Sequence, residues 1–414
     1  MSVQARSIAP ALTSLPDWTT RTHAAPKPAS DVAYALITDR ASFDALEGDW
    51  TALFDRAGRP TQVFQTFNWN WHWANTYLAT APGGIAGLEL AIVTARRNGQ
   101  LIAVWPLVSE RQRGIKQVFW MGDPVSQYGD VIVDDIPDAV DVLAGGWQYL
   151  VANAKADVVR LRRVRAEAAI APLMPMIGAY VADRLIAPYL ELSSAPDFAN
   201  YEERYSGHAR RNRRRLLRRL QERGDVVFER HRGGLRAREL AIKALEMKAE
   251  WLKHRGLISH AISDQRMSRF FADVAEGRDR SANCIVTALN SNGETAAIEV
   301  CFECKGRVAM HVIVYQLKFE KSGAGVILME NSLRDGFKEN IGVYDMLAPG
   351  DSYKLDWADA TSDVYDWVKP LSLAGFAYAR LYLELVRPKI KAGLAAMPQN
   401  WRKIITRAAT SKSD

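Results

Sequence analysis

The sequence has few cysteines and no long apolar run. Its three cysteines, Cys284, Cys301 and Cys304, cannot form the disulfide framework of a small secreted protein. No apolar run reaches the ~18–20 residues that a helix needs to span a bilayer. The first residues also lack the sustained apolar core of a secretory signal. We therefore expect a chain without a transmembrane segment that works in a reducing cytoplasm.

The sequence also lacks a cluster of histidine, cysteine and carboxylate residues with the spacing of a metal site, so no metal is expected. Cys301 and Cys304 have a spacing seen in metal and redox sites, but no second pair accompanies them. They lie in a strand-like run, where alternation would place them on opposite faces. We interpret both as structural thiols.

The remaining composition is that of an ordinary globular protein. Hydrophobic residues make up 48% and charged residues 24% of the 414 residues, which excludes wholesale disorder and allows two or three domains. The formal net charge of +7 is moderate but unevenly distributed. A positive patch attracts phosphates, nucleic acid or an anionic membrane without distinguishing between them.

Much of that charge lies in one predicted helix. Eight arginines fall between Arg210 and Arg223, while Leu216, Leu217 and Leu220 form one apolar seam. A solvated helix would carry acidic partners at the i,i+4 spacing, and only Glu222 is present. The arginines therefore pair with acidic groups elsewhere in the fold, bind an anionic ligand or nucleic acid, or lie on an anionic membrane.

The order of predicted elements suggests two copies of one α+β unit. Each half contains a helix pair, an antiparallel meander, a helix and a strand, so each copy should be a largely antiparallel sheet flanked by helices. The turn pairs Asn98-Gly99, Asn292-Gly293 and Lys305-Gly306 indicate hairpins. We predict a flexible leader (1–30), a first unit (31–165), a second unit (166–390) that ends in an amphipathic helix (Leu371–Val386) and a polar tail (391–414).

The first unit contains a tryptophan cluster, which we expect in its core. The helix predicted at Thr66–Leu78 carries most of the cluster. Its members are Trp50, Trp69, Trp71, Trp73 and Trp105.

In the second unit we predict a meander of three strands followed by a glycine-rich turn. The meander strands are Asn283–Leu289, Thr295–Glu303 and Arg307–Gln316, and a further strand is expected at Val343–Leu347.

The glycine-rich turn contains Lys321, Ser322, Gly323 and Gly325 and opens the helix Val326–Phe337. The free amides of a helix N-terminus hold phosphate oxygens, although such a turn can also simply cap the preceding loop.

Several short sequence motifs, taken in their order along the chain, resemble those of a known family. They are Phe64-Gln65-Thr66…Trp69, Ala103-Val104-Trp105-Pro106-Leu107, Gly122-Asp123…Tyr128-Gly129-Asp130, Arg210-Arg211-Asn212…Arg215, and Tyr344-Asp345-Met346-Leu347…Gly350-Asp351-Ser352-Tyr353-Lys354…Trp357. Together they resemble the GNAT acyltransferase superfamily, more closely its tandem FemAB-like branch, and most closely the CelD/BcsL-type acetyltransferases of cellulose and exopolysaccharide biosynthesis. The resemblance covers roughly residues 32–385.

The resemblance implies acyl transfer from acetyl-CoA or another acyl-CoA to an amine, here an amine of a sugar or cell-envelope precursor. It implies a catalytic second unit and a degenerate first unit. The diphosphate of the donor would lie on Lys321, Ser322, Gly323 and Gly325. Glu320 stands where the family has Gln or Arg, and a carboxylate there repels a diphosphate, which Lys321 partly offsets.

Two alternatives remain. In the Fem branch the donor is an aminoacyl-tRNA, which the helix Arg210–Arg223 could contact. A non-catalytic scaffold of polysaccharide synthesis is the second alternative. We expect a cytoplasmic location, at the inner face of the membrane if the arginines bind anionic lipid.

Candidate catalytic residues lie on the meander. Glu299 has apolar neighbours that would raise its pKa, which suits a general base, although strand alternation could equally place it on a solvated face. Tyr315 could protonate the leaving thiolate, or it is a sheet-end aromatic. His311 is four residues from Tyr315, so we expect both on the same face.

Candidate substrate-binding residues follow the last predicted strand. Asp345 could bind the amine of an acceptor, and Lys354 could bind a phosphate or a carboxylate. Tyr353 lies between them in the same phrase, and a structural role for these side chains remains the alternative.

Overall fold

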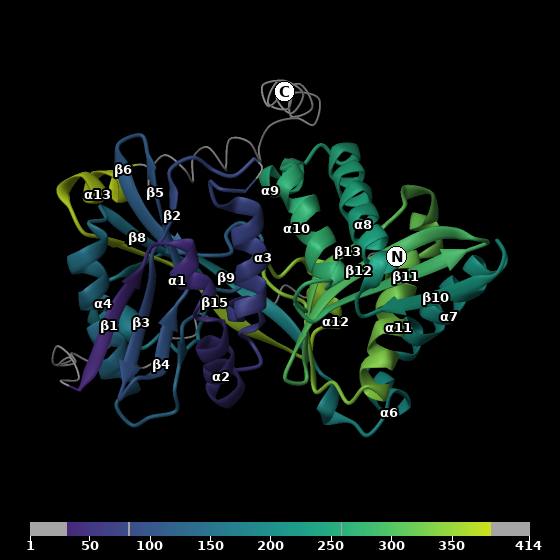
Figure 1. Ribbon diagram of the computed structural model, residues 1–414. Helices are drawn as coiled ribbons and strands as arrows, with labels where there is room; N and C mark the ends of the chain where they lie inside the picture. The colour runs from purple at the N-terminus through teal and green to yellow at the C-terminus, as the bar shows by residue number, and fades with distance from the viewer. Residues whose placement is uncertain (1–30, 82, 258, 382–414) are drawn as a thin grey trace.

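The structure of the protein, a computed structural model, describes residues 31–81, 83–257 and 259–381. Two α/β units lie side by side, with helices covering the faces of their sheets (Figure 1). Mixed helices and largely antiparallel strands confirm the predicted α+β class. The predicted leader (1–30) and tail (391–414) lie outside the described residues, as does the end of the predicted helix Leu371–Val386.

In the described residues, the first unit contains three helices of 11 or more residues and some shorter helical segments around two groups of strands. Its elements are β1 (Val32–Ile37), α1 (Arg40–Asp44), α2 (Glu47–Ala57), η2 (Val63–Gln65), α3 (Phe67–Tyr77), β2 (Leu88–Leu90), β3 (Ile92–Arg97), β4 (Gln100–Trp105), β5 (Leu107–Gln112), β6 (Ile115–Trp120), β7 (Ile132–Val133), α4 (Ala139–Ala154), β8 (Val158–Arg165) and α5 (Leu173–Met176).

The second unit contains the predicted meander and the helices that cover it. Its elements are β9 (Tyr180–Glu191), η3 (Leu192–Ser194), α6 (Phe198–Glu202), α7 (Gly207–Gln221), β10 (Val226–His231), α8 (Gly234–His254), α9 (His260–Ser263), α10 (Gln265–Glu276), β11 (Cys284–Ser291), β12 (Glu294–Cys304), β13 (Arg307–Tyr315), η4 (Leu317–Ser322), α11 (Ala324–Lys338), β14 (Val343–Asp345), α12 (Ser352–Trp357), β15 (Ala360–Pro370) and α13 (Leu373–Ala377).

Helix α3 forms where the sequence predicts it. The Thr66 hydroxyl accepts a hydrogen bond from the Trp69 amide, which satisfies one free N–H group of the first turn. Trp69 and Trp73 are fully buried, while Trp71 only packs against the edge of the core. Together with buried Trp50 and Trp105, these side chains confirm the prediction that most of the tryptophan cluster is core.

The three predicted hairpin turns are also present. Asn98, Asn292 and Lys305 have φ angles of 52°, 52° and 46°, and each precedes a glycine whose φ is also positive. Two consecutive residues with positive φ match the right-handed twist of the flanking strands. The turns thereby fix the register of β3 with β4, of β11 with β12, and of β12 with β13.

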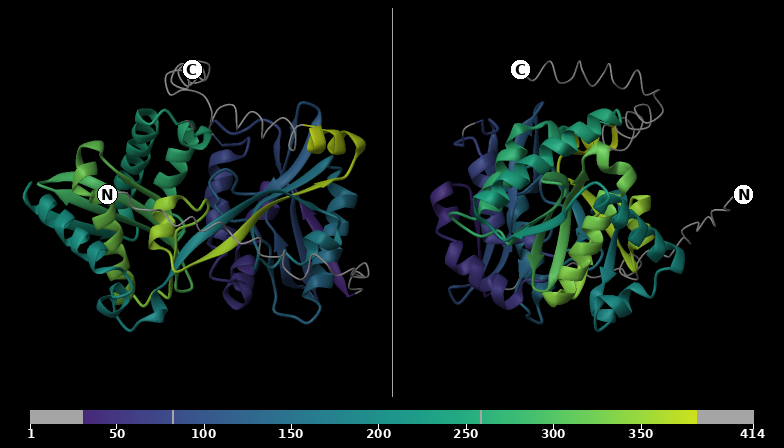
Figure 2. Two further views of the ribbon diagram at one scale, coloured as in Figure 1. Left: turned by 180° about the vertical axis from the view of Figure 1, so that it is seen from behind. Right: turned by 90° about the vertical axis from the view of Figure 1, so that its right-hand side faces the viewer.

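The strands form one small sheet and one large sheet. The small sheet has the order β1-β3-β4-β7, and the large sheet has the order β10-β11-β12-β13-β14-β9-β15-β8-β6-β5-β2. The large sheet therefore contains strands of both units. Seen from behind, β9 and β15 cross the middle of the molecule as two long neighbouring strands (Figure 2).

The sequence did not predict β9 or β15. Strand β9 contains Pro188, which lacks a ladder donor and breaks the pattern of a central strand. Both strands are stabilised by distant partners, since β15 pairs with β8 and with β9, and β9 pairs with β14. The predicted boundary between residues 165 and 166 stays a prediction. The large sheet continues across this boundary, since it contains both β8 and β9.

Within the described ranges, no helix combines the length and the apolar character needed to cross a membrane.

Candidate functional site

The predicted glycine turn opens helix α11. Gly323 has a φ of 67°, in the left-handed region that favours glycine, and it precedes the first helical residue, Ala324. The first amides of α11 have no capping side chain, as the N-terminus of an anion site requires. Leu216 of α7 packs against Gly323, and the ring of Tyr315 packs against Gly325, but Gly325 and Val326 remain partly exposed.

The carboxylate of Glu320 is not an isolated charge beside this turn. Arg255, near the end of α8, donates to Glu320 Oε1 at 2.9 Å, and the Tyr315 hydroxyl donates to the same oxygen at 3.2 Å. Lys321 is exposed next to them. The repulsion that the sequence predicts between Glu320 and a diphosphate is therefore offset by Arg255 as well as by Lys321. Sequence reasoning missed Arg255, because it is distant along the chain.

Glu299 lies on the face of the sheet that α11 covers, and its exposed fraction is 1%. The Ser332 hydroxyl donates to one carboxylate oxygen at 2.5 Å, and the Tyr344 hydroxyl donates to the other. Burial raises the pKa of Glu299, while these two hydrogen bonds oppose the shift. The side chain is thus not on a solvated face, and its raised pKa suits the predicted base. Its catalytic role stays a prediction.

His311 and Tyr315 do not share a face of β13, so that prediction is wrong. Met310 pairs with Cys301 and Val312 pairs with Val300, which leaves His311 as the extra residue of a β-bulge. The His311 ring packs against Trp69, Phe271 and Phe302 on the α10 side of the sheet. Tyr315 packs beside α11 on the other side.

The bulge turns His311 toward the first unit. Its Nε2 atom lies 2.6 Å from the carbonyl oxygen of Val125 and 3.4 Å from Nε2 of Gln127. Its Nδ1 atom is buried without a hydrogen-bond partner. Burial lowers the pKa of His311 to about 4, so the ring is neutral at pH 7.

This neutral histidine predicts a pH dependence of stability. Because the unfolded chain binds a proton near pH 6.5 and the folded chain only near pH 4, stability should fall as the pH is lowered through that interval. The variant His311→Gln should flatten the difference between urea midpoints measured at pH 7 and pH 5. The exposed His208 provides the matched control, because His208→Gln should leave that difference unchanged. An equal pH dependence in wild type and His311→Gln contradicts the prediction.

Asp345 is the centre of a buried network between the two units. Its exposed fraction is 0%, and it accepts hydrogen bonds from Tyr128 at 2.8 Å, Arg165 at 3.0 Å and Arg307 at 2.7 Å, and from the amide of Leu347. Tyr128 and Arg165 belong to the first unit. These contacts occupy both carboxylate oxygens, and the predicted contact with an acceptor amine stays a prediction.

Lys354 and Tyr353 lie at the start of α12, after the loop that follows β14. Lys354 donates to the carbonyl oxygens of Leu347 and Pro349, both at 3.0 Å, and burial lowers its pKa to about 8. Tyr353 is 43% exposed and lies near Asp351, whose charge also acts on Lys248 of α8. Lys248, which sequence reasoning missed, thus faces the predicted substrate residues from α8.

Strands β13 and β14 meet only briefly. They pair in parallel from Arg307 to Ala309 against Val343 to Asp345, and β13 then continues to Tyr315 without that partner. The unpaired edge of β13 leads from His311 to the N-terminus of α11. Backbone groups along such an edge are free to bind the amides of an extended ligand.

The arginines of α7 divide between two faces. Arg213 points inward and pairs with Glu330 of α11 at 2.8 Å. The other face carries a row of exposed guanidiniums, none of which forms an ion pair within the described part of the chain; we call it the α7 arginine face. Its residues are Arg211, Arg214, Arg215, Arg218 and Arg219.

The cysteines behave as the sequence predicts. Cys301 and Cys304 are buried, free thiols, and they pack into two different core clusters on opposite faces of β12. Among the residues that the structure describes, no group of histidine, cysteine, aspartate and glutamate side chains could hold a metal ion.

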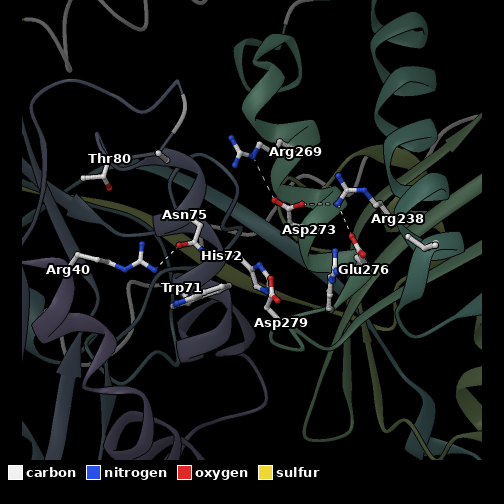
Figure 3. Close-up of a pocket in the computed structure, with 13 residues that line it drawn as sticks. Arg40, Trp71, His72, Asn75, Thr80, Arg238, Arg269, Asp273, Glu276 and Asp279 are labelled. Carbon is white, nitrogen blue, oxygen red and sulfur yellow. Dashed lines mark hydrogen bonds and ion pairs between the residues drawn. The ribbon is translucent and has the colours of Figure 1, made fainter.

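A cavity of about 720 Å³ lies elsewhere, between α1 and α3 of the first unit and α8 and α10 of the second (Figure 3). None of the sequence-predicted site residues lines it. Its acidic and basic side chains largely neutralise one another, as in the ion pairs of Arg238 with Asp273 at 2.8 Å and Glu276 at 3.0 Å. This cavity is separate from the α11 corner.

Comparisons with known proteins give matches to a domain family and to solved structures. Residues 207–355 match the family model of the acetyltransferase (GNAT) domain. The solved structure of FemX superposes with a TM-score of 0.58 at 10% identity, over 85% of this chain and 100% of FemX. A conserved protein of unknown function from Bacteroides thetaiotaomicron VPI-5482 gives 0.50 at 12% identity, over 81% of this chain and 100% of its own. A comparison with curated protein sequences gives no match.

The family match begins at α7 and ends within α12, and it includes the α11 corner, Glu299 and Asp345. The structural likeness extends over the first unit as well, and at such low identity it shows a shared fold. The chain therefore has a fold like that of FemX, and its residues 207–355 are similar to the acetyltransferase (GNAT) domain.

Proposed function

We propose that the protein is an acyl-CoA-dependent N-acyltransferase that transfers an acetyl group to an amine of a sugar or of a cell-envelope or exopolysaccharide precursor. The α11 corner is the observation that carries the proposal. There, an uncapped helix N-terminus with a glycine in the left-handed conformation lies beside Lys321 and an internally neutralised Glu320. Free amides and nearby cations suit the diphosphate of a CoA donor.

The neighbouring elements fit the rest of such a donor. The unpaired edge of β13 leads from the α11 corner to His311 at the junction of the units, and amide groups of an extended acyl-carrier arm could pair with it. The acyl end would then lie near the predicted acceptor residues Tyr353 and Lys354. Glu299 would take the proton of the amine. Tyr315 packs against Gly325 at the α11 corner, so its predicted role as the acid for the departing thiolate needs an acyl end close to that corner.

The donor part of the proposal predicts a charge effect at Lys321. Lys321→Glu places a second carboxylate at the α11 corner, and it should raise the Kd for acetyl-CoA ~10-fold or more, because charge-assisted contacts to phosphate weaken and repulsion is added. Lys338→Glu changes the same residue type at the other end of α11, where Lys338 is exposed, and should leave the Kd unchanged. Calorimetric titration measures both, and an unchanged Kd in Lys321→Glu removes the corner from donor binding.

The α7 arginine face favours a second candidate function, transfer from an aminoacyl-tRNA. Guanidiniums without acidic partners are suited to phosphate backbones, and the fold is shared with FemX. In this case tRNA, and not acetyl-CoA, should raise the melting temperature, and its affinity should fall steeply with salt. Stabilisation by acetyl-CoA alone decides for the first candidate, and stabilisation by neither ligand decides for a non-catalytic scaffold.

A membrane-surface location is also part of the proposal. Basic residues near an anionic bilayer contribute ~1 kcal/mol each, and the five side chains of the α7 arginine face are exposed together. Co-sedimentation with vesicles that contain anionic lipid, compared with neutral vesicles, tests whether the enzyme binds at the inner face of the membrane.

A further inference from the structure

Helix α13 presents two large apolar side chains to solvent. Leu373 is 90% exposed, more than any other large apolar side chain that the structure describes, and Phe376 is 53% exposed. The two residues are three positions apart, so they lie on the same face of the helix. Single exposed apolar residues are common on protein surfaces, whereas an apolar group with a polar rim marks a contact with a protein or a membrane.

Local contacts hold this face of α13 outward. The Ser372 hydroxyl accepts a hydrogen bond from the Gly375 amide at 3.0 Å and donates one to Asp157 at 2.6 Å, which fixes the start of α13 to the chain before β8. Gly375 lies so close to the carbonyl oxygen of Asp157 that a Cβ atom would not fit between them. The inner side of α13 is therefore filled by the protein itself, and Leu373 and Phe376 have no room to turn inward.

The turn between β5 and β6 lies beside α13 in both views of the molecule (Figures 1 and 2). The hydroxyl of Tyr378, just after α13, donates to the side chain of Gln117 in β6 at 3.4 Å. Tyr378 and Ile115, the first residue of β6, pack against the same small core cluster. The side chains of this turn therefore belong to the surroundings of the α13 face.

Basic side chains surround the apolar ones. Arg111 and Arg113 are exposed at the β5–β6 turn, and Lys155 is exposed directly after α4. None of these three has a carboxylate within ion-pair distance in the described part of the chain. The guanidinium of Arg380 lies 5.7 Å from the centre of the Phe376 ring. We call the two apolar side chains and these cations the α13 surface; its residues are Leu373, Phe376, Arg111, Arg113, Lys155 and Arg380.

The chain that follows this surface has the same sign of charge. The described chain ends at Leu381, and residues 382–414 contain seven lysines and arginines but only two acidic residues, Glu384 and Asp414. These residues and the rim of the α13 surface repel one another, so the tail does not complement that surface. An anionic bilayer complements both, because apolar side chains enter its interfacial region while basic side chains approach its headgroups.

The α13 surface is distinct from the α7 arginine face. Helix α7 lies at the opposite end of the molecule from α13 in both views (Figures 1 and 2). The leucines of α7 are buried or half-buried, so its outer face offers lipid only charge. The α13 surface combines charge with apolar side chains, whose contact with lipid is not screened by salt.

We propose that the α13 surface binds the face of an anionic bilayer, with Leu373 and Phe376 in the interfacial region and the surrounding cations at the lipid headgroups. The first unit then carries a lipid contact of its own, at the end of the molecule away from α7. This inference needs neither acyl transfer nor lipid binding by the α7 arginine face.

The test is co-sedimentation of the full chain with vesicles of phosphatidylcholine and phosphatidylglycerol, compared with vesicles of phosphatidylcholine alone. The double variant Leu373→Ser/Phe376→Ser should lower the partition coefficient on the anionic vesicles ~10-fold or more, because two large apolar side chains no longer enter the interface. Arg111→Glu should lower it ~5-fold or more, since a favourable charge near the headgroups is reversed. Leu235→Ser, which removes a leucine that is 70% exposed at the start of α8, is the matched control and should have no effect.

Four results would overturn the inference. Equal partition of the double variant and the wild type removes the apolar contact, and equal binding to both kinds of vesicle removes the anionic lipid. A lower melting temperature of the double variant without vesicles would show that another part of the chain covers Leu373 and Phe376. A change from dimer to monomer in size-exclusion chromatography would show that a second copy covers them. None of these measurements depends on acyl transfer, so failure here leaves the proposed transferase activity standing.

Discussion

Asp345→Asn should lower the free energy of unfolding by about 3–5 kcal/mol, because it removes the counter-charge of two arginines in the interior. The carboxylate is fully buried and holds Arg165 at 3.0 Å and Arg307 at 2.7 Å. Asparagine keeps the shape of the side chain but not the charge. Urea unfolding followed by tryptophan fluorescence measures the loss, which is large relative to the total stability of a typical domain.

The comparison variant for Asp345 is Asp335→Asn near the end of α11. Asp335 pairs with Lys338, whose side chain is 73% exposed, so the change should cost less than about 1 kcal/mol. Adding Arg307→Met to Asp345→Asn should recover part of the loss, because one unpaired cation is removed. A small loss in Asp345→Asn together with a raised KM for the acceptor would instead support the predicted substrate contact.

The same residue shows which features the sequence predicts. Asp345 was identified as a candidate site residue from its local sequence motif. Its partners Tyr128 and Arg165, however, are separated from it by 217 and 180 residues. Pairs at such separation leave no local pattern. Strands β9 and β15, which bring these partners together, were missed for the same reason. By contrast, β11, β12 and β13 were predicted closely, because their alternation and their Asn-Gly and Lys-Gly turns are local signals.

The β-bulge of β13 shows a second limit of prediction from the sequence. His311 lies where one extra residue breaks the alternation of β13, and its side chain then reaches Val125 of the first unit. Alternation predicts the wrong face for any residue beyond such a point. For Glu299 no register was needed, because its apolar neighbours alone correctly predicted a raised pKa.

Glu299→Gln should lower kcat on the order of 100-fold or more while leaving the Kd for acetyl-CoA unchanged, because a general base acts on the amine and not on the donor. The variant cannot take a proton, whereas its amide still fills the space beneath α11. It leaves one of the Ser332 and Tyr344 hydroxyls without its acceptor, so stability should fall by about 1–3 kcal/mol, and the assay temperature is chosen below the onset of unfolding.

The pH profile separates a base from a residue that only supports the fold. Since burial raises the pKa of Glu299, the wild-type rate should fall as the pH is lowered through that raised pKa, and this acidic limb should be absent in Glu299→Gln. Glu303→Gln, on the same strand but partly exposed and paired with Arg232, should keep both the limb and the rate. If Glu299→Gln retains wild-type kcat, the carboxylate is a core group, and the proton of the amine leaves by another route.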